Sequence, residues 1–250
     1  MMKLRADRLL VARGLVESRT RARALIEANL VESDGRRIVR PGDLLAEDAP
    51  LTLLGRDHPW VSRGGIKLDH ALRHFGLEVE SAVCLDLGAS TGGFTDVLLS
   101  RGAKRVYAVD VGHGQLHQRL RADPRVVSLE GVNARRLSRE QIPEPIDLLV
   151  CDASFISLKL VLPAALEMVK PGGSLVALIK PQFELSAQAI GKGGVVRDVA
   201  QHALACETVT TWLAQQPGWR VGEVIESPIT GPSGNREFLM QAAKGIASQV

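Results

Sequence analysis

Residues 83–96 read VCLDLGASTGGFTD, an apolar run that leads through a glycine-rich turn into a second apolar run. The alternating apolar residues of 83–87 are typical of a buried parallel strand, and residues 94–99 predict the first turns of a helix. The turn between them contains three glycines that let the backbone approach a ligand closely, Gly88, Gly92 and Gly93. A strand, turn and helix of this kind predict a binding site for a nucleotide-like cofactor.

The chemistry of the turn separates two classes of cofactor. An acid, Asp86, precedes the first glycine, and Ser90 stands where the dinucleotide-binding pattern G-x-G-x-x-G has its second glycine. A carboxylate at this place repels phosphate and suits a cation, so a NAD-dependent oxidoreductase is disfavoured. S-adenosylmethionine has an ammonium and a sulfonium group but no phosphate. The pattern D-x-G-x-x-x-G-G resembles the first motif of class I methyltransferases, which bind S-adenosylmethionine.

The next predicted strand, residues 105–110, ends in Asp110, whose carboxylate can accept hydrogen bonds from both ribose hydroxyls of an adenosine. Asn133 is expected at the adenine edge or, equally, as a helix cap. The full set of predicted cofactor contacts is Asp86, Gly88, Ser90, Gly92, Gly93, Phe94, Asp110, Val111, Asn133, Ala134 and Asp152, with Phe94 or Val111 against the adenine.

Strands and helices alternate through the rest of the chain, which predicts a mostly parallel sheet covered on both faces. A helix is expected at 65–75. The strands are expected near 82–87, 105–110, 126–130, 147–151, 174–179, 220–226 and 235–242. The resulting fold class is α/β, a Rossmann-like, seven-stranded class I methyltransferase fold.

Four charged residues are expected at one edge of this sheet, because open α/β sheets bind ligands beyond the carboxyl ends of their strands. Asp152 and Lys180 end neighbouring strands, Lys67 lies on the helix at 65–75, and Glu237 lies on the last strand. Each residue alone has an ordinary interpretation as a solvated charge. As a set they resemble the Lys-Asp-Lys-Glu tetrad of FtsJ-type RNA ribose 2'-O-methyltransferases, which implies that they are the catalytic residues.

Transfer of a methyl group to a ribose hydroxyl needs in-line attack and a group that deals with the hydroxyl proton. Lys180 is the candidate base, or it stays charged and stabilises the developing alkoxide. Asp152 and Glu237 would orient the lysines, and Lys67 would steady the ribose or phosphate. Methylation of a base nitrogen is disfavoured, because residues 152–155 (DASF) lack the two prolines of the D-P-P-Y motif.

The first 25 residues are strongly basic, with seven Lys or Arg residues against two acids. The pattern predicts two short helices, of which Gly14 ends the first and Ser18 caps the second, followed by two strands joined at Asp34-Gly35. A compact basic unit suits a nucleic-acid backbone, although scattered arginines are usually a solvated helix face.

Residues 5–54 resemble an S4 RNA-binding domain, with the pattern R-x-D-x-x-L-x-x-x-G-L, then S-R-x-x-A-x-x-L-I, G-R and P-G-D. The expected organisation is an S4-like domain at 1–55, a linker at 56–62 and an FtsJ-like methyltransferase domain at 63–250. The predicted RNA contacts are Arg5, Ser18, Arg19, Arg21, Arg23, Arg36 and Arg63.

The S4 domain, the methyltransferase domain and the tetrad together resemble the TlyA family, the hemolysin-named S4-domain rRNA methyltransferases. Further similar elements are VSRGG at 61–65, GKGGVVRD at 191–198 and SPITGPSGNREF at 227–238. The resemblance implies rRNA in ribosomal subunits as the partner and the 2'-hydroxyl of cytidine as the target, in small-subunit and sometimes large-subunit rRNA. The alternative is a ribosome-assembly factor that binds RNA through an inert methyltransferase fold, which predicts the loss of Asp86 or of the tetrad.

Composition excludes several other classes. The chain has 250 residues, 45% of them hydrophobic, and a net charge of +3. No apolar stretch approaches the ~18 residues of a membrane helix, and no signal-peptide pattern opens the chain, so we expect no membrane contact and a cytoplasmic location. Three isolated cysteines have no zinc spacing, and His113 and His117 lack partner acids, so no metal is expected. The oligomeric state cannot be predicted from these features.

Overall fold

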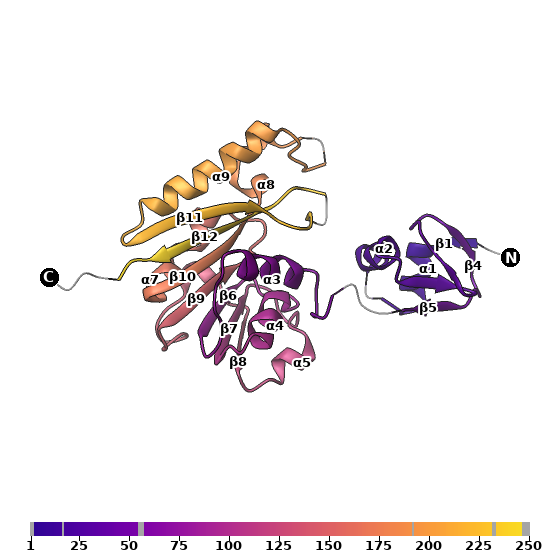
Figure 1. The fold of residues 1–250 in the computed structure, drawn as a ribbon, viewed down its shortest axis with the longest axis horizontal. Coiled ribbons are helices and arrows are strands. Elements are labelled where there is room, and N and C mark those ends of the chain that lie inside the picture. Colours follow the sequence, from indigo (N-terminus) through magenta and orange to yellow (C-terminus); the bar gives the residue numbers. More distant parts are fainter. Residues whose placement is uncertain (1–2, 17, 55–57, 192, 232–233, 247–250) are drawn as a thin grey trace. The chain divides into compact units, whose positions relative to one another are not determined.

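The structure is a computed structural model and describes residues 3–16, 18–54, 58–191, 193–231 and 234–246 (Figure 1). The chain forms two compact units, Met1–Pro59 and Trp60–Val250. Within the predicted linker, residues 56 and 57 lie outside the described residues. Val61 belongs to the second unit, because its backbone N–H donates to Asp96 Oδ2 at 2.8 Å.

The first unit combines two helices with two small sheets. Its elements are β1 (Lys3–Arg5), α1 (Ala6–Ala12), α2 (Arg19–Glu27), β2 (Val31–Ser33), β3 (Arg36–Arg37), β4 (Leu44–Ala46) and β5 (Leu51–Leu53). β1 pairs with β4, and β2 lies between β3 and β5, with all pairs antiparallel. Apolar side chains from both helices and from β2 make one small core, which includes Leu10, Leu25, Ile26 and Val31.

The local signals in the first unit act as predicted. Ser18 Oγ accepts a hydrogen bond from the backbone N–H of Arg21 at 3.2 Å, which is the expected N-cap of α2. Asp34 and Gly35 both have positive φ, as a tight hairpin between β2 and β3 requires. Gly14 follows α1 with φ +66°, the usual conformation of a residue that ends a helix.

The second unit is a seven-stranded sheet in the order β11-β12-β10-β9-β6-β7-β8. Its strands are β6 (Val83–Leu87), β7 (Arg105–Asp110), β8 (Val126–Glu130), β9 (Ile146–Cys151), β10 (Val169–Ile179), β11 (Trp219–Glu226) and β12 (Phe238–Lys244). Only β12 runs antiparallel to its neighbours. Strand order reverses between β6 and β9, so the crevice at their carboxyl ends is the expected ligand site. The predicted fold class is confirmed.

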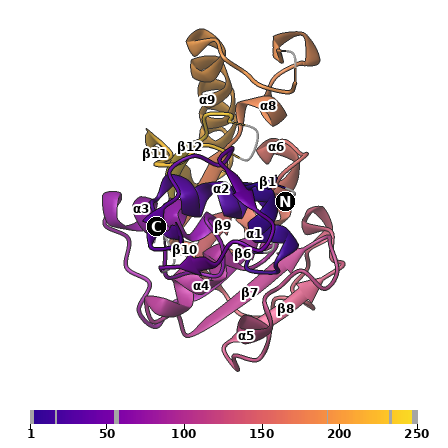
Figure 2. The ribbon, with the colours of Figure 1, turned by 90° about the vertical axis from the view of Figure 1, so that its right-hand side faces the viewer.

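Helices cover both faces of this sheet. They are α3 (Gly64–His74), α4 (Gly93–Ser100), α5 (Gln118–Arg121), α6 (Leu158–Val161), α7 (Pro163–Met168), α8 (Pro181–Glu184) and α9 (Val199–Ala214), with 3₁₀ turns at Ala134–Arg136 and Ala187–Ala189. Alternate residues of β6 enter different cores: Cys84 packs with α3 and α4, whereas Leu85 packs with α6, α7 and α9. Figure 2 shows α5 and β8 at one edge of the sheet and α9 and β11 at the other.

Two strand boundaries differ from the predictions. β10 begins at Val169 rather than at 174, but its pairing with β9 is interrupted between Val169 and Ser174, where Pro171 has no N–H and Gly172 has φ +81°. β12 begins at Phe238 rather than at 235. Asn235 contacts the loop before α9 instead of belonging to the strand, because its Oδ1 accepts from the backbone N–H of Val196 at 2.9 Å.

Candidate active site

The glycine turn between β6 and α4 is built by close packing. Gly88 has φ +79°, and a side chain there would lie 3.0 Å from the backbone of Ala153. At Gly92, with φ +97°, a side chain would collide with Leu116 and Leu120. Gly93 is also occluded, by the hydroxyl of Ser62. All three glycines are therefore required by the fold, but only Gly88 lines the cavity at the strand ends.

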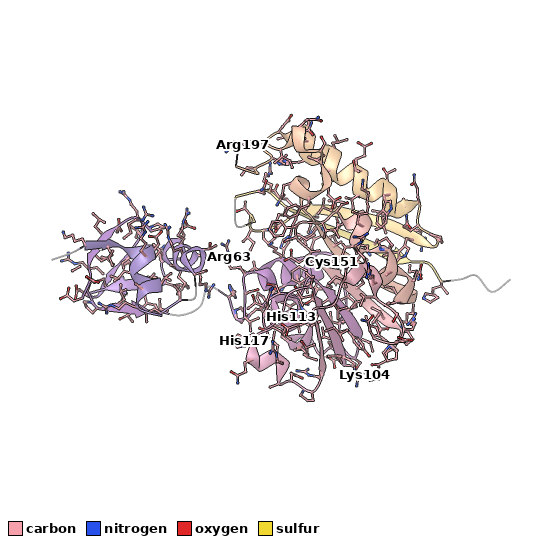
Figure 3. The ribbon with its side chains drawn as sticks, turned by 180° about the vertical axis from the view of Figure 1, so that it is seen from behind. Arg63, Lys104, His113, His117, Cys151 and Arg197 are labelled. Carbon is pink, nitrogen blue, oxygen red and sulfur yellow. The ribbon has the colours of Figure 1, made fainter. Side chains whose placement is uncertain are left out.

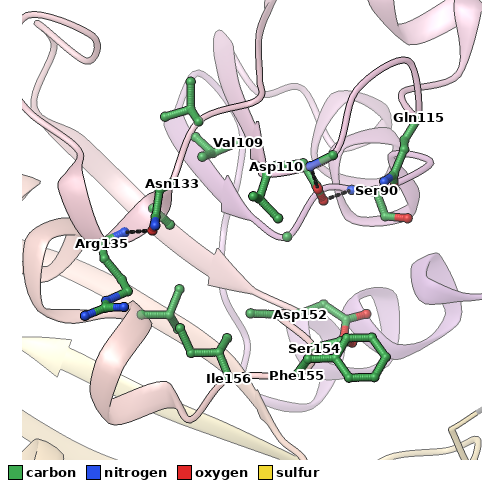
Figure 4. A pocket seen from close by; sticks show the side chains of 17 residues that line it. Ser90, Val109, Asp110, Gln115, Asn133, Arg135, Asp152, Ser154, Phe155 and Ile156 are labelled. Atoms are coloured by element: carbon green, nitrogen blue, oxygen red, sulfur yellow. Dashed lines mark hydrogen bonds between the residues drawn. The ribbon is translucent and has the colours of Figure 1, made fainter.

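That cavity has a volume of about 660 Å³ and lies beyond the carboxyl ends of β6, β7 and β9 (Figure 4). Its wall is mostly apolar. The described lining residues are Gly88, Ser90, Val109, Asp110, Val111, Gly112, Gln115, Val132, Asn133, Ala134, Arg135, Asp152, Ala153, Ser154, Phe155, Ile156 and Val161. Seven of the predicted cofactor contacts are among them: Gly88, Ser90, Asp110, Val111, Asn133, Ala134 and Asp152.

Asp110 is oriented before any ligand arrives. Its Oδ2 accepts from the backbone N–H of Ser90 at 2.8 Å, and its Oδ1 accepts from the backbone N–H of Gly112 at 2.7 Å (Figure 4). Each oxygen keeps a second lone pair for a ribose hydroxyl. Asn133 has the cap role that the sequence left open, since its Oδ1 accepts from the backbone N–H of Arg135 at 3.0 Å, and it also lines the cavity.

Asp86 differs from its predicted role as a direct neighbour of a cationic ligand. The side chain is fully buried and does not line the cavity. Its Oδ2 accepts from Thr95 Oγ1 at 2.7 Å, and its Oδ1 has no hydrogen-bond partner among the described residues. Burial, reinforced by the charges of Asp152 and Asp110, raises the pKa of Asp86 to about 7 despite the Thr95 hydrogen bond.

Phe94 also differs from the prediction that it contacts adenine. Its ring is buried in the core between α3 and α4, so it cannot reach the cavity. Val111, the other candidate, is 73% exposed and lines the cavity. The sequence could not distinguish the two, because both apolar residues lie close to a predicted ligand-binding turn, Phe94 at the start of α4 and Val111 directly after β7.

The four tetrad residues form one continuous chain of alternating charge. Lys67 Nζ lies 2.5 Å from Glu237 Oε2 and 3.9 Å from Asp152 Oδ2, and Lys180 Nζ lies 2.6 Å from Asp152 Oδ1. Lys67, Lys180 and Glu237 are buried. Glu237 immediately precedes β12 rather than lying on it, and its backbone carbonyl accepts from the N–H of Ser227. The structure thus brings together four residues that span 170 positions of the sequence.

Lys180 is held by three oxygens. Besides the ion pair with Asp152, its Nζ donates to Ser154 Oγ at 2.8 Å and to the backbone carbonyl of Asp152 at 3.3 Å. The Asp152 ion pair is close but is not aligned as a hydrogen bond. Asp152 and Ser154 both line the cavity, so the charge chain meets the cavity at these two residues.

Ser154 and Phe155 were missed by sequence reasoning. Ser154 could have been found, because a polar residue two positions after a strand end faces the same crevice as the strand terminus. Phe155 could not, because its 91% exposure and its φ of +64° are visible only in the structure. Its ring lies 5.2 Å from that of Phe183, measured between centroids.

The predicted RNA contacts divide between the two units. In the first unit, Arg5 and Arg19 both contact Asp7, whereas Arg21 contacts His58 Nε2 at 2.8 Å. Ser18 serves as a helix cap, as described above. Arg23 faces Glu27 at 4.0 Å, and Arg36 is exposed on β3. In the second unit, Arg63 lies at the start of α3 (Figure 3).

The described residues offer neither a metal-binding cluster nor a membrane-spanning helix. Within the described residues, no three His, Cys, Asp or Glu side chains are grouped to hold a metal ion. His113 and His117 both lie between β7 and α5 (Figure 3). No helix in the described part of the chain is long and apolar enough to span a bilayer.

The cavity fits S-adenosylmethionine and defines a class of protein. It presents two carboxylates, Asp110 and Asp152, and apolar walls at Val109, Val132 and Ile156. These groups suit an adenosine that carries cationic substituents rather than phosphates. With the seven-stranded sheet, they define a methyltransferase that uses S-adenosylmethionine.

Comparisons with known proteins agree. The FtsJ-like methyltransferase family matches residues 60–244, and the S4 domain family matches residues 4–49. The 16S/23S rRNA (cytidine-2'-O)-methyltransferase TlyA of Mycobacterium tuberculosis is 47% identical over 95% of this chain and 89% of its own length. The chain belongs to the TlyA family of FtsJ-like methyltransferases.

Two further relatives show the range of the similarity. The 23S rRNA (cytidine-2'-O)-methyltransferase TlyA of Campylobacter jejuni is 34% identical over 80% of this chain and 77% of its own length. The structure of a hemolysin-named protein from Streptococcus thermophilus is 44% identical, with a TM-score of 0.77 over 98% of this chain and 90% of that one. The predicted family and cofactor are confirmed.

Proposed function

We propose that this protein methylates the ribose 2'-hydroxyl of a cytidine in rRNA, in the small ribosomal subunit and, as a second substrate, in the large one. The observation that carries the proposal is the continuous charge chain from Glu237 through Lys67 and Asp152 to Lys180, which reaches the cofactor cavity. The TlyA relatives, named as cytidine-2'-O-methyltransferases of 16S/23S rRNA and of 23S rRNA, supply the nucleotide and the subunits. A ribosomal substrate would place the protein in the cytoplasm.

On the cofactor side, Asp110 would bind the ribose hydroxyls, and the backbone at Gly88 and Ser90 would follow the ligand closely. Val111, Asn133 and Ala134 would surround the adenine. Asp152 faces the same cavity and would bind a cationic part of the ligand. When bound, S-adenosylmethionine supplies an electrophilic methyl group on a positively charged sulfur.

On the substrate side, Lys180 would act on the 2'-hydroxyl. Its Nζ either takes up the hydroxyl proton or, as an ammonium, stabilises the oxygen that becomes negative. Asp152 and Ser154 restrict that nitrogen to one position, which lowers the entropic cost of in-line attack. Glu237 would hold the Lys67 side chain in place, so that Lys67 can steady the ribose or its phosphate.

RNA capture would fall to residues 1–55, with residues 56–62 as the connection to the methyltransferase domain at 63–250. Arg5, Arg19, Arg36 and Arg63 are the cations we propose for contact with RNA phosphates. Ser18, Arg21 and Arg23 complete the proposed interface.

The test is methyl transfer from tritiated S-adenosylmethionine to isolated 30S and 50S subunits, followed by mapping of the labelled nucleotide. We expect label on a cytidine 2'-oxygen in 16S rRNA, with a second labelled cytidine in 23S rRNA. Label on a base nitrogen, or cofactor binding with no transfer to either subunit, would contradict the proposal. The second result would favour an assembly factor.

A further inference from the structure

Asp7 is a buried acid at the start of α1 that the reaction does not use. Its carboxylate is fully buried, yet it accepts three hydrogen bonds from two arginines. Arg5 donates from Nε at 3.0 Å and from Nη2 at 3.1 Å, and Arg19 donates from Nη2 at 3.0 Å. One carboxylate therefore holds two guanidinium groups that come from separate segments of the chain.

The carboxylate is not needed to cap its own helix. The backbone N–H groups of Ala6 and Asp7, at the first turn of α1, already donate to the carbonyls of Asp43 and Pro41 at 2.8 and 3.1 Å. An acid in the first turn of a helix usually stabilises such free N–H groups. Here the side chain serves the two arginines instead.

The two arginines keep donors for a ligand. Arg5 and Arg19 are 44% and 53% exposed, although their partner is fully buried. Three of their N–H groups donate to Asp7, and the others make no further hydrogen bond with the described residues. The guanidinium group of Arg5 also lies against the backbone of Gly42, since a Cβ atom at that position would be 3.5 Å from Arg5 Nη1.

We infer that Asp7 is a positioning residue for RNA, which holds Arg5 and Arg19 as one preorganised pair of cations for backbone phosphates. The inference rests on the proposed function of residues 1–55. Net charge alone would attract RNA weakly, because residues 1–59 contain eleven Lys or Arg and nine Asp or Glu, a net charge of +2. A fixed pair of guanidinium groups loses less side-chain entropy on binding a phosphate than two free ones.

The ionised state of Asp7 is consistent with this role. Hydrogen bonds from Arg5, and more weakly from Arg19, lower the pKa of Asp7 to about 2 against the opposing effect of burial. The other charged groups of the surrounding elements, Lys3 on β1 and Arg8 on α1, carry the same sign as the arginines. Among the described residues, Asp43 is an acid on the turn that contacts the start of α1, since its backbone carbonyl accepts from the N–H of Ala6.

The test measures RNA binding by the full chain. Simple electrostatics and positioning of the arginines predict opposite changes in RNA affinity when Asp7 is replaced. Asp7→Asn removes a negative charge beside a basic surface, so simple electrostatics predicts tighter binding of a polyanion. Positioning predicts weaker binding. We expect Asp7→Asn to weaken binding of in vitro transcribed 16S rRNA roughly tenfold, equivalent to ~1.4 kcal/mol, and to reduce its dependence on salt.

A matched control is Asp34→Asn, which removes one exposed acid from the same unit at a φ of +51° that asparagine adopts readily. Its RNA affinity should be unchanged or slightly tighter. In a variant that already carries Arg5→Gln and Arg19→Gln, adding Asp7→Asn should cause no further loss. Equal or tighter binding by Asp7→Asn alone would overturn the inference.

Folding is checked separately. Amide signals of Leu25 and Ile26 report whether the first unit of each variant is folded. If Asp7→Asn unfolds this unit, the inference can still be tested on the parent chain. The Nε–H signals of Arg5 and Arg19 should shift when 16S rRNA is added. Unchanged signals would overturn the inference. If the parent chain binds no RNA, the proposed function of residues 1–55 fails, and the inference fails with it.

Discussion

Asp7 in the first unit and Asp86 in the second are both fully buried acids, but their pKa values are shifted in opposite directions. Two arginines hold the pKa of Asp7 at about 2, whereas burial without a cationic partner raises that of Asp86 to about 7. Burial alone therefore does not decide whether a carboxyl group carries charge. A cationic hydrogen-bond donor decides it, because the neutral hydroxyl of Thr95, although it lies closer to Asp86 than either arginine lies to Asp7, does not offset burial.

The tetrad extends this comparison. Asp152 and Glu237 each lie against a lysine ammonium, as Asp7 lies against arginines. In the tetrad both lysines and Glu237 are buried, Asp152 is partly buried, and the charges balance, which suits the fixing of reacting groups. In the first unit the cations are half exposed and outnumber the acid, which suits the capture of an anion. The following changes test these differences, beginning with the largest expected effect.

The stability of the Asp86→Asn variant relative to the parent should increase as the pH rises. Because the pKa of Asp86 is raised, this carboxyl group contributes to the parent's free energy of unfolding fully below about pH 4. That contribution is lost as the pH rises through about 7. Between pH 4 and pH 8, the difference in free energy of unfolding should move in favour of the variant by up to ~4 kcal/mol.

Urea titration followed by tryptophan fluorescence measures this change in the second unit alone, because Trp60, Trp212 and Trp219 are the chain's three tryptophans. A stability difference that stays constant from pH 4 to pH 8 would show that Asp86 is ionised despite its burial.

Lys180→Ala should lose turnover by a factor of a hundred to a thousand, about 3–4 kcal/mol in activation free energy. The role proposed for this group is to act on the reacting oxygen, so binding of S-adenosylmethionine and of RNA should stay near parent values. Ser154→Ala keeps the ammonium and should lose less. Single-turnover transfer of tritiated methyl to 30S subunits measures both.

The pH dependence of the parent enzyme separates the two roles of Lys180. If Lys180 is the base, the single-turnover rate of the parent should rise with pH and then level off, and Lys180→Ala should lack this rise. If Lys180 stays charged, the parent should show no rise in rate that depends on Lys180. Near-parent methylation by Lys180→Ala would remove the tetrad from the mechanism.

Glu237→Ala should destabilise the second unit by about 3 kcal/mol, because it leaves the Lys67 ammonium buried without its closest partner. Replacing both members with apolar side chains, Lys67→Met with Glu237→Leu, should recover most of the stability but not the activity. Urea unfolding of both variants gives the comparison. Equal stability of Glu237→Ala and the parent would mean that Asp152 alone is a sufficient partner for Lys67.

Asp110→Ala should weaken binding of S-adenosylmethionine by roughly 2 kcal/mol through the loss of charged hydrogen bonds to the ribose. Calorimetric titration measures the affinity. Asp123→Ala is the matched control, since Asp123 pairs with Arg125 and does not line the cavity. Equal losses in the two variants would assign the effect to general charge rather than to the ribose contact.

The sequence predicted the placement of Asp110, Asp152 and Lys180 well, because each ends a strand and strand ends in a parallel sheet share one edge. It did not predict the depth of Asp86. Period-two alternation shows which face of a sheet a side chain enters, but not whether the helix that follows covers it, and here Thr95 of α4 lies directly against the carboxylate.

Two other positions were beyond sequence reasoning for related reasons. Phe94 lies in the first turn of α4 and Val111 follows β7, and only the packing of α4 against α3 decides that the phenylalanine is interior. The double use of Asp7 by Arg5 and Arg19 depends on how two helices meet, which no local pattern records.

The pairing of Lys67 with Glu237 joins residues that are 170 positions apart. Glu237 is fixed by β12, which is inserted between β10 and β11 and is the last strand of the sheet to be synthesised. A chain that emerges from the ribosome therefore contains both lysines and Asp152 before it contains their final partner. Addition of β12 between β10 and β11 therefore closes the sheet and brings in the fourth charge of the proposed catalytic set at the same stage of synthesis.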